Sequence, residues 1–128
     1  LSSKAGAIQP AKQGYTLTLT GVDTHVLWFT DRPNRHAGFL PVSRFVGYWS
    51  KAFKKDPPNA GLVHLNMGYD HHGQPQPIAL ELRAPAWRAN TGTLTFSVRS
   101  LGKALQPSAR LQHVSLYIDD MTFPFPYQ

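Results

Sequence analysis

The sequence contains no cysteine. This absence excludes disulfide bonds, thiolate metal sites and cysteine nucleophiles. A chain without thiols is compatible with the periplasm or the outside of a cell, because it offers nothing to misoxidise there. The absence therefore fits an exported protein, although many cytosolic proteins also lack cysteine.

Charged side chains are scarce, and negative ones are the scarcest. Only 16% of the residues are charged, and 13 lysines and arginines face 7 aspartates and glutamates, for a net charge of +6. A basic excess favours anionic partners such as nucleic acid, acidic lipid headgroups and sulfated or phosphorylated glycans. A modest positive charge can also serve solubility alone, so charge by itself leaves both interpretations open.

Motifs for the common catalytic mechanisms are missing. The sequence has no Gly-x-Ser-x-Gly elbow, no phosphate-binding loop and no His-Glu-x-x-His pair. Glu81 is the only glutamate, and the adjacent Asp119 and Asp120 would point to opposite faces of a strand. Glycoside hydrolysis needs two facing carboxylates, and the sequence offers no evident pair. For lack of catalytic residues of these kinds, we expect a protein that is not an enzyme and that uses no cofactor.

Long apolar runs are also absent, since none approaches the roughly 18–20 residues that a membrane-spanning helix needs. What the chain does contain is enough apolar material for one core: 41% of its 128 residues are hydrophobic, including seven phenylalanines, five tyrosines and three tryptophans. This size and composition predict a single folded domain.

Alternation of apolar and polar residues predicts strands along most of the chain. The alternation is strict over residues 15–20, 93–99 and 113–119. It is weaker over residues 25–30, 61–67 and 78–82. Such short strands, mostly adjacent in sequence, predict a mainly β fold of six to seven strands. An antiparallel, Greek-key-like β-sandwich is the favoured form, and an open barrel is the alternative.

The remaining segments are expected to be loops or ends. Residues 1–14 read as a flexible entry segment, and residues 15–128 as the sandwich domain. Polar turns or loops are expected over 31–38, 68–77, 84–92 and 102–109. The chain then finishes in a proline-broken tail with three aromatic residues: Phe123, Phe125 and Tyr127. These rings would either cover an open edge of the core or bind a membrane interface or a protein partner.

One segment interrupts the β pattern and predicts an amphipathic helix over residues 43–55. Ser43 is a plausible N-cap, and Pro57 and Pro58 would stop the helix. Apolar residues at helical spacing form one wide face, which we expect to pack on the sheet: Val42, Phe45, Val46, Trp49 and Phe53.

The opposite side of this helix gathers positive charge. Spacings of four, three and four residues place Arg44, Tyr48, Lys51 and Lys55 on one stripe, with Lys54 beside it. Cations around an aromatic ring could bind an acidic lipid headgroup, a sulfated glycan or a nucleic-acid phosphate. An ordinary solvated helix face would explain the same residues.

Two arginines of the preceding turn could extend this basic surface. Arg32 and Arg35 lie in the segment Asp31-Arg32-Pro33-Asn34-Arg35. They could clamp a phosphate or a carboxylate between them. A structural interpretation is favoured, in which an arginine pairs with Asp31 and fixes the turn.

A weaker candidate is a metal site built from Asp70, His72 and His64. Imidazole and carboxylate groups suit zinc, copper or nickel, and a further ligand would have to come from elsewhere, such as His36 or His113. The spacing matches no known metal motif. An exposed polar loop is therefore the favoured interpretation.

Several segments resemble a family of exported bacterial proteins of unknown function. The resemblance covers about residues 15–119, and its most specific part is Trp28-Phe29-Thr30-Asp31-Arg32-Pro33. The other matching segments are 17–22, 34–35, 45–49, 57–60 and 114–119. The resemblance implies export and a shared fold, and it implies no reaction.

Together these observations predict an exported, non-catalytic binding module, periplasmic or secreted after loss of a signal peptide. Its basic surface, centred on the helix, would bind phosphoinositide-like headgroups of an anionic membrane or a sulfated glycan; nucleic acid is less favoured. The first alternative is an envelope accessory protein that docks a protein partner through the aromatic tail. The second is a metal-dependent enzyme.

Overall fold

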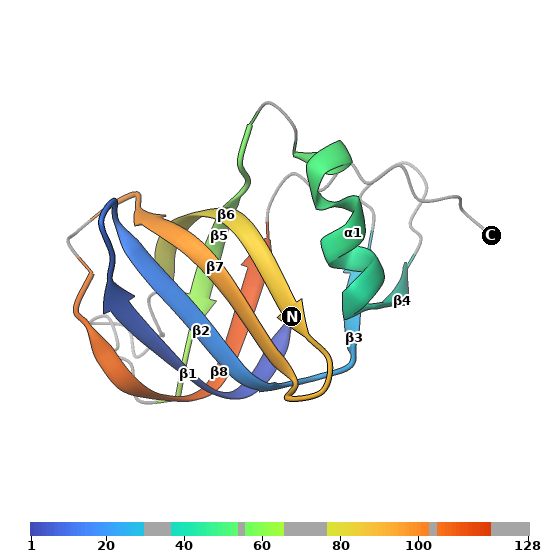
Figure 1. Ribbon diagram of the computed structural model, residues 1–128, viewed down its shortest axis with the longest axis horizontal. Coiled ribbons are helices and arrows are strands. Elements are labelled where there is room, and N and C mark those ends of the chain that lie inside the picture. Colours follow the sequence, from blue (N-terminus) through green and yellow to red (C-terminus); the bar gives the residue numbers. More distant parts are fainter. Residues whose placement is uncertain (30–36, 54–55, 66–76, 103–104, 119–128) are drawn as a thin grey trace, which may run out of the picture.

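Figure 1 shows a computed structural model of the chain, which describes residues 1–29, 37–53, 56–65, 77–102 and 105–118. The elements follow one another as β1 (Ser2–Pro10), β2 (Tyr15–Val22), β3 (His25–Phe29), β4 (Ala37–Pro41), α1 (Val42–Ala52), β5 (Asn59–Val63), β6 (Ile78–Arg88), β7 (Thr93–Ser100) and β8 (Ser108–Ile118).

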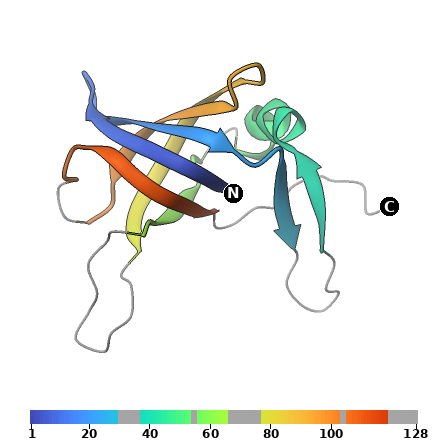
Figure 2. The same ribbon diagram turned by 90° about the horizontal axis from the view of Figure 1, so that it is seen from below.

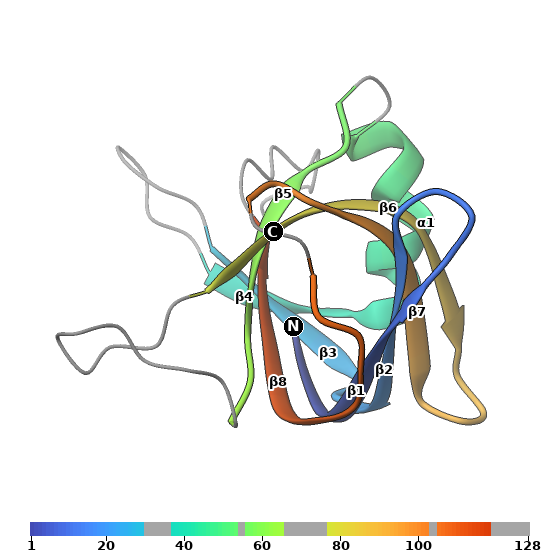
Figure 3. The same ribbon diagram turned by 90° about the vertical axis from the view of Figure 1, so that its left-hand side faces the viewer.

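Six antiparallel strands close into a barrel in the order β1-β2-β7-β6-β5-β8. The barrel closes where β8 pairs with β1, for example through Ser3 and Val114. Figure 3 shows these strands arranged around a common interior. The mainly β character is thus confirmed, and the expected sandwich is wrong. Both folds direct every second side chain inward, so alternation alone does not separate them.

The first strand corrects a second expectation, because Ser2–Pro10 is β1 rather than a flexible entry segment. It pairs with β2 on one side and with β8 on the other. Its inward positions are mostly small, and Ile8 is its one large buried side chain. Small Gly6 fits the wall closely, since a Cβ there would stand 3.1 Å from the Thr18 carbonyl oxygen. A strand of such small residues gives little hydrophobic alternation.

Two strands run further than the alternation suggested. β6 continues through residues 84–88, and β8 begins at Ser108, both within expected loops. Each strand holds one non-glycine residue with positive φ, Ala84 at 51° and His113 at 49°. The β6–β7 register shifts between Arg83 and Ala86, as at a β-bulge. Such irregularities break the two-residue period and hide a strand from pattern analysis.

The barrel interior is filled by the apolar residues of the strands, which alternation places on one face. Leu94, Phe96 and Val98 of β7 are buried, as are Val114 and Leu116 of β8. The other large side chains that are almost wholly buried in the wall are Leu17, Leu19, Leu62, Leu80 and Leu82. The apolar residues of the alternating segments 15–20, 93–99 and 113–119 thus face the core, and Tyr15 and Ile118 among them are only partly buried.

The strands β3 and β4 form a separate two-stranded sheet, and α1 follows β4 directly. Figures 1 and 2 show this hairpin and α1 together at one end of the barrel. Trp49 of α1 reaches the interior of that end, with its ring centroid 5.5 Å from that of Phe96. The helix therefore covers this end of the barrel with its apolar face.

The apolar face of α1 is confirmed, whereas its expected start and end are not. Val42, Phe45 and Trp49 are buried. The helix begins at Val42, whose N–H donates to the carbonyl of Thr24 over 3.0 Å, so Ser43 lies inside the first turn and does not cap it. It ends at Ala52 rather than residue 55. Within the described ranges, no helix is long and apolar enough to cross a membrane.

Candidate functional site

The exposed face of α1 carries the part of the predicted basic stripe that the structure describes. Arg44 and Lys51 are exposed, and Tyr48 between them is half-buried. Arg44 Nη2 donates to Tyr48 Oη over 3.4 Å, and the guanidinium carbon lies 5.9 Å from the centre of the tyrosine ring. The helical spacing thus brings Arg44 and Tyr48 into contact, as predicted.

Negative charge is absent from this helix. None of its eleven residues is acidic. In the described part of the chain both ion pairs involve Glu81, and no carboxylate lies within 4.0 Å of Arg44 or Lys51. Burial of Val42, Phe45 and Trp49 fixes the opposite face of α1 against the molecule. Two cations are therefore displayed on a rigid support without a carboxylate partner among the described residues.

The rest of the predicted basic surface lies outside the described residues. This applies to Lys54 and Lys55 after the helix and to Arg32 and Arg35 before β4. The aromatic tail, with Phe123, Phe125 and Tyr127, also lies outside them. A continuous basic patch and a docking role of the tail stay predictions.

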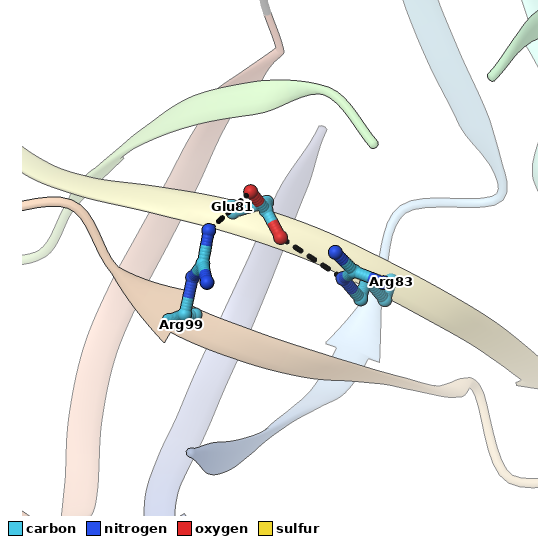
Figure 4. Close-up of polar contacts among 3 residues, drawn as sticks. All are labelled: Glu81, Arg83 and Arg99. Atoms are coloured by element: carbon cyan, nitrogen blue, oxygen red, sulfur yellow. Dashed lines mark hydrogen bonds and ion pairs between the residues drawn. The ribbon is translucent and has the colours of Figure 1, made fainter. Parts of the chain in front are cut away.

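A second charged cluster was missed by the sequence analysis. Figure 4 shows Glu81 of β6 between two arginines. Arg83 Nε donates to Glu81 Oε1 over 2.9 Å, and Arg99 Nη2 donates to Oε2 over 3.0 Å. The spacing Glu81-Leu82-Arg83 on a strand would have signalled that the two charged side chains share a face. Arg99 is the register partner of Glu81 across β6 and β7, which only the pairing reveals.

This cluster has the character of a structural network. The Glu81 side chain is 12% exposed, whereas those of Arg83 and Arg99 are 59% and 67% exposed. The hydrogen bond from Arg83 holds the pKa of Glu81 below its ordinary value; burial opposes this effect, and the charges of Arg99 and Arg83 reinforce it. Glu81 is thus an anion whose hydrogen bonds are already supplied, which leaves it poorly suited to act as a general acid or base.

Only one of the three proposed metal ligands is described. His64 follows β5, and its Nδ1 is buried without a hydrogen-bond partner among the described residues. Burial lowers the pKa of this imidazole. Asp70, His72 and His36 lie outside the described residues, and His113 is exposed on β8. Among the residues that are described, no three His, Asp or Glu side chains gather as a metal site.

The β3–β4 hairpin displays an apolar pair that pattern analysis did not single out. Leu27 and Phe39 are register partners and are 53% and 71% exposed. Their neighbours Val26 and Leu40, which face each other across the same two strands, are buried. The hairpin therefore has one face in the core and one apolar face in solvent. The sequence predicts a turn over 31–38 and no strand at 37–41, so the pairing of Leu27 with Phe39 could not be foreseen.

Comparison with known proteins does not assign the chain to a family. No family model, no curated protein sequence and no solved structure matches the chain. The resemblance to exported bacterial proteins stays a prediction. A function can therefore be inferred only from the chain's own residues.

Proposed function

We propose that this protein is a non-catalytic module that binds anionic surfaces through the exposed face of α1. The observation that carries the proposal is the display of Arg44 and Lys51 on either side of Tyr48, on a helix without acidic residues. On sequence grounds we further propose that it acts in the periplasm or after secretion.

The geometry of α1 suits an extended array of negative charges. Arg44 and Lys51 are seven residues apart, which corresponds to about 10 Å along a helix axis. Two such cations can contact neighbouring headgroups or sulfates at the same time. Each basic residue held near an anionic membrane surface contributes about 1 kcal/mol of attraction. No carboxylate of the described residues lies within 4.0 Å of either cation, so this attraction stays available to a ligand.

Tyr48 adds order to the basic face. Its hydroxyl accepts the hydrogen bond from Arg44, and its ring lies within cation–π distance of the guanidinium. These contacts restrict the arginine side chain before any ligand arrives. Less conformational entropy is then lost when the guanidinium binds an anion.

The proposal is tested with heparin and with phosphoinositide-containing vesicles at about 50 and 300 mM salt. Because the attraction is electrostatic, we expect binding at the low salt concentration and marked weakening at the high one. The double variant Arg44→Glu, Lys51→Glu should lose at least about tenfold in affinity, in line with roughly 1 kcal/mol for each cation.

A matched control separates this face from net charge. Lys12→Glu with Arg110→Glu changes the net charge by the same amount at two exposed sites, in the β1–β2 turn and near the start of β8. This variant should keep most of the binding. The proposal fails if neither probe binds at low salt, or if both double variants lose affinity equally.

A further inference from the structure

We propose that the Leu27–Phe39 face of the β3–β4 hairpin inserts into the interfacial layer of an anionic lipid bilayer. This inference rests on the proposed function and identifies the anionic surface as a membrane. The apolar pair would enter the headgroup layer while Arg44 and Lys51 of α1 contact lipid phosphates.

The exposure of the pair is the first support. Phe39 is the most exposed large hydrophobic residue among those described, at 71%, and its cross-strand partner Leu27 is 53% exposed. The two side chains lie side by side because directly paired residues share one face of a sheet. The opposite face of the hairpin, with Val26 and Leu40, already packs in the core.

The position of the pair is the second support. β4 ends at Pro41 and α1 begins at Val42, so only four residues lie between Phe39 and Arg44. Figure 2 shows the hairpin and the helix next to each other at the same end of the barrel. Apolar anchors beside basic residues are typical of proteins that lie on anionic membranes.

The size and chemistry of this face favour a bilayer over the other anionic ligands. A sulfated glycan would leave Leu27 and Phe39 without an apolar partner. A stable protein interface buries roughly 800 Å² on each partner, and two side chains supply only a fraction of that. Binding at the interface requires no such continuous area, since a few apolar side chains and several cations act together.

The depth of insertion is limited by the backbone. Among the described strands, β3 and β4 pair only with each other. Their outer N–H and carbonyl groups would lose water in the hydrocarbon core without gaining a partner. The proposal therefore places the Leu27 and Phe39 side chains in the headgroup layer, with the hairpin backbone still hydrated.

The first test is flotation with vesicles of phosphatidylcholine alone or with added phosphatidylserine, with heparin binding measured in parallel. The variant Leu27→Ser, Phe39→Ser should lose about tenfold in partitioning to the anionic vesicles while it keeps its affinity for heparin. Leu65→Ser is the matched control: Leu65 is 57% exposed and follows the end of β5 that points away from α1 (Figure 1). It should partition like the parent protein.

The second test reads insertion directly. Because the chain contains no cysteine, Phe39→Cys can be labelled at one position with an environment-sensitive fluorophore. Anionic vesicles should shift its emission to the blue, and spin labels near the top of the acyl chains should quench it. A label at Gln13→Cys, in the exposed β1–β2 turn, should show neither effect.

The outcomes separate the two proposals. If heparin and vesicles bind, but the hairpin variant partitions normally and the label at position 39 stays in water, membrane insertion is wrong and the anion-binding proposal stands. If nothing anionic binds at low salt, both are wrong. If the parent chain is a dimer that Leu27→Ser, Phe39→Ser makes monomeric, the face is an interface between two copies and the inference is overturned.

Discussion

Trp28 packs against Gly38, its register partner in the β3–β4 hairpin. A Cβ built on Gly38 would stand 2.9 Å from Cζ2 of the indole and 3.1 Å from Cε2. The glycine therefore allows the ring to approach the backbone of the opposite strand more closely than any other residue would permit. This contact helps to hold the hairpin on the core, against which Trp28 is partly buried.

Gly38→Ala should destabilise the protein. The added methyl group must displace the indole, and overpacking of this kind costs about 1–3 kcal/mol. Urea unfolding should show a lower midpoint, and the summed emission of the three tryptophans should move to the red as the Trp28 ring becomes more exposed. A free energy of unfolding equal to or above the parent's would show that the ring accommodates the methyl group without cost.

Replacing Gly47 by alanine should instead stabilise the protein. Gly47 is an exposed position inside α1, and a Cβ there would meet nothing within 4 Å. Alanine is favoured over glycine inside a helix by about 0.5–1 kcal/mol, so Gly47→Ala should raise the urea midpoint. This variant also serves as the control for Gly38→Ala, because the covalent change is identical.

Glu81→Gln should lower the free energy of unfolding at neutral pH. The loss should be only about 1 kcal/mol, because ion pairs with exposed arginines contribute weakly. The pKa of Glu81 lies below its ordinary value of 4.5, so the folded chain binds a proton less readily than the unfolded one. The stabilisation that ionised Glu81 contributes is complete above pH 4.5 and is lost as pH falls through the folded-state pKa. Urea midpoints between pH 6 and 3 should therefore fall less steeply in the variant. If the midpoints of the parent and the variant fall equally with pH, the lowered pKa of Glu81 is contradicted.

His64→Leu should remove part of the sensitivity to mild acid. Burial lowers the pKa of His64 from its ordinary value of 6.5, so the unfolded chain takes up this proton first as pH falls. Stability should then decrease below about pH 6.5 in the parent protein. Midpoints measured at pH 7.5 and 5 should differ less in His64→Leu than in the parent protein. The account is wrong if His64→Leu leaves the difference unchanged.

Ala84→Gly should stabilise the bulge of β6. Ala84 has φ of 51°, a left-handed conformation that costs a side chain about 1–2 kcal/mol and glycine almost nothing. The more flexible unfolded chain offsets part of this gain, so we expect a net increase of about 0.5–1 kcal/mol. Ala86→Gly, two residues along the same strand, should instead destabilise. Equal losses at both positions would contradict the role of the backbone angle.

The strands with a regular two-residue period could be predicted, and the way they close could not. Leu94, Phe96 and Val98 show their inward face in the sequence, and the helix shows its face through Phe45 and Trp49. Closure depends instead on β1, whose small residues leave only Ile8 as a large buried side chain. It also depends on strand order, and a local pattern carries no information about which distant strand is the neighbour.

The contacts of the candidate site could likewise be predicted only in part. Arg44 and Tyr48 were found because helical spacing alone brings them together. Arg99 was not associated with Glu81, since their contact joins residues eighteen positions apart through the β6–β7 register. Leu27 and Phe39 were missed for the same reason, because neither residue stands out until its strand is paired.

The pairing of β1 with β8 also has a consequence in time. Ser3 meets Val114, so the seam joins segments more than a hundred residues apart. Contacts of such long sequence separation make folding slow. On the ribosome, one edge of β1 must wait for its neighbour until β8 has been synthesised. During that interval the open edge of β1 is exposed to pairing with other chains, as unpaired strand edges are.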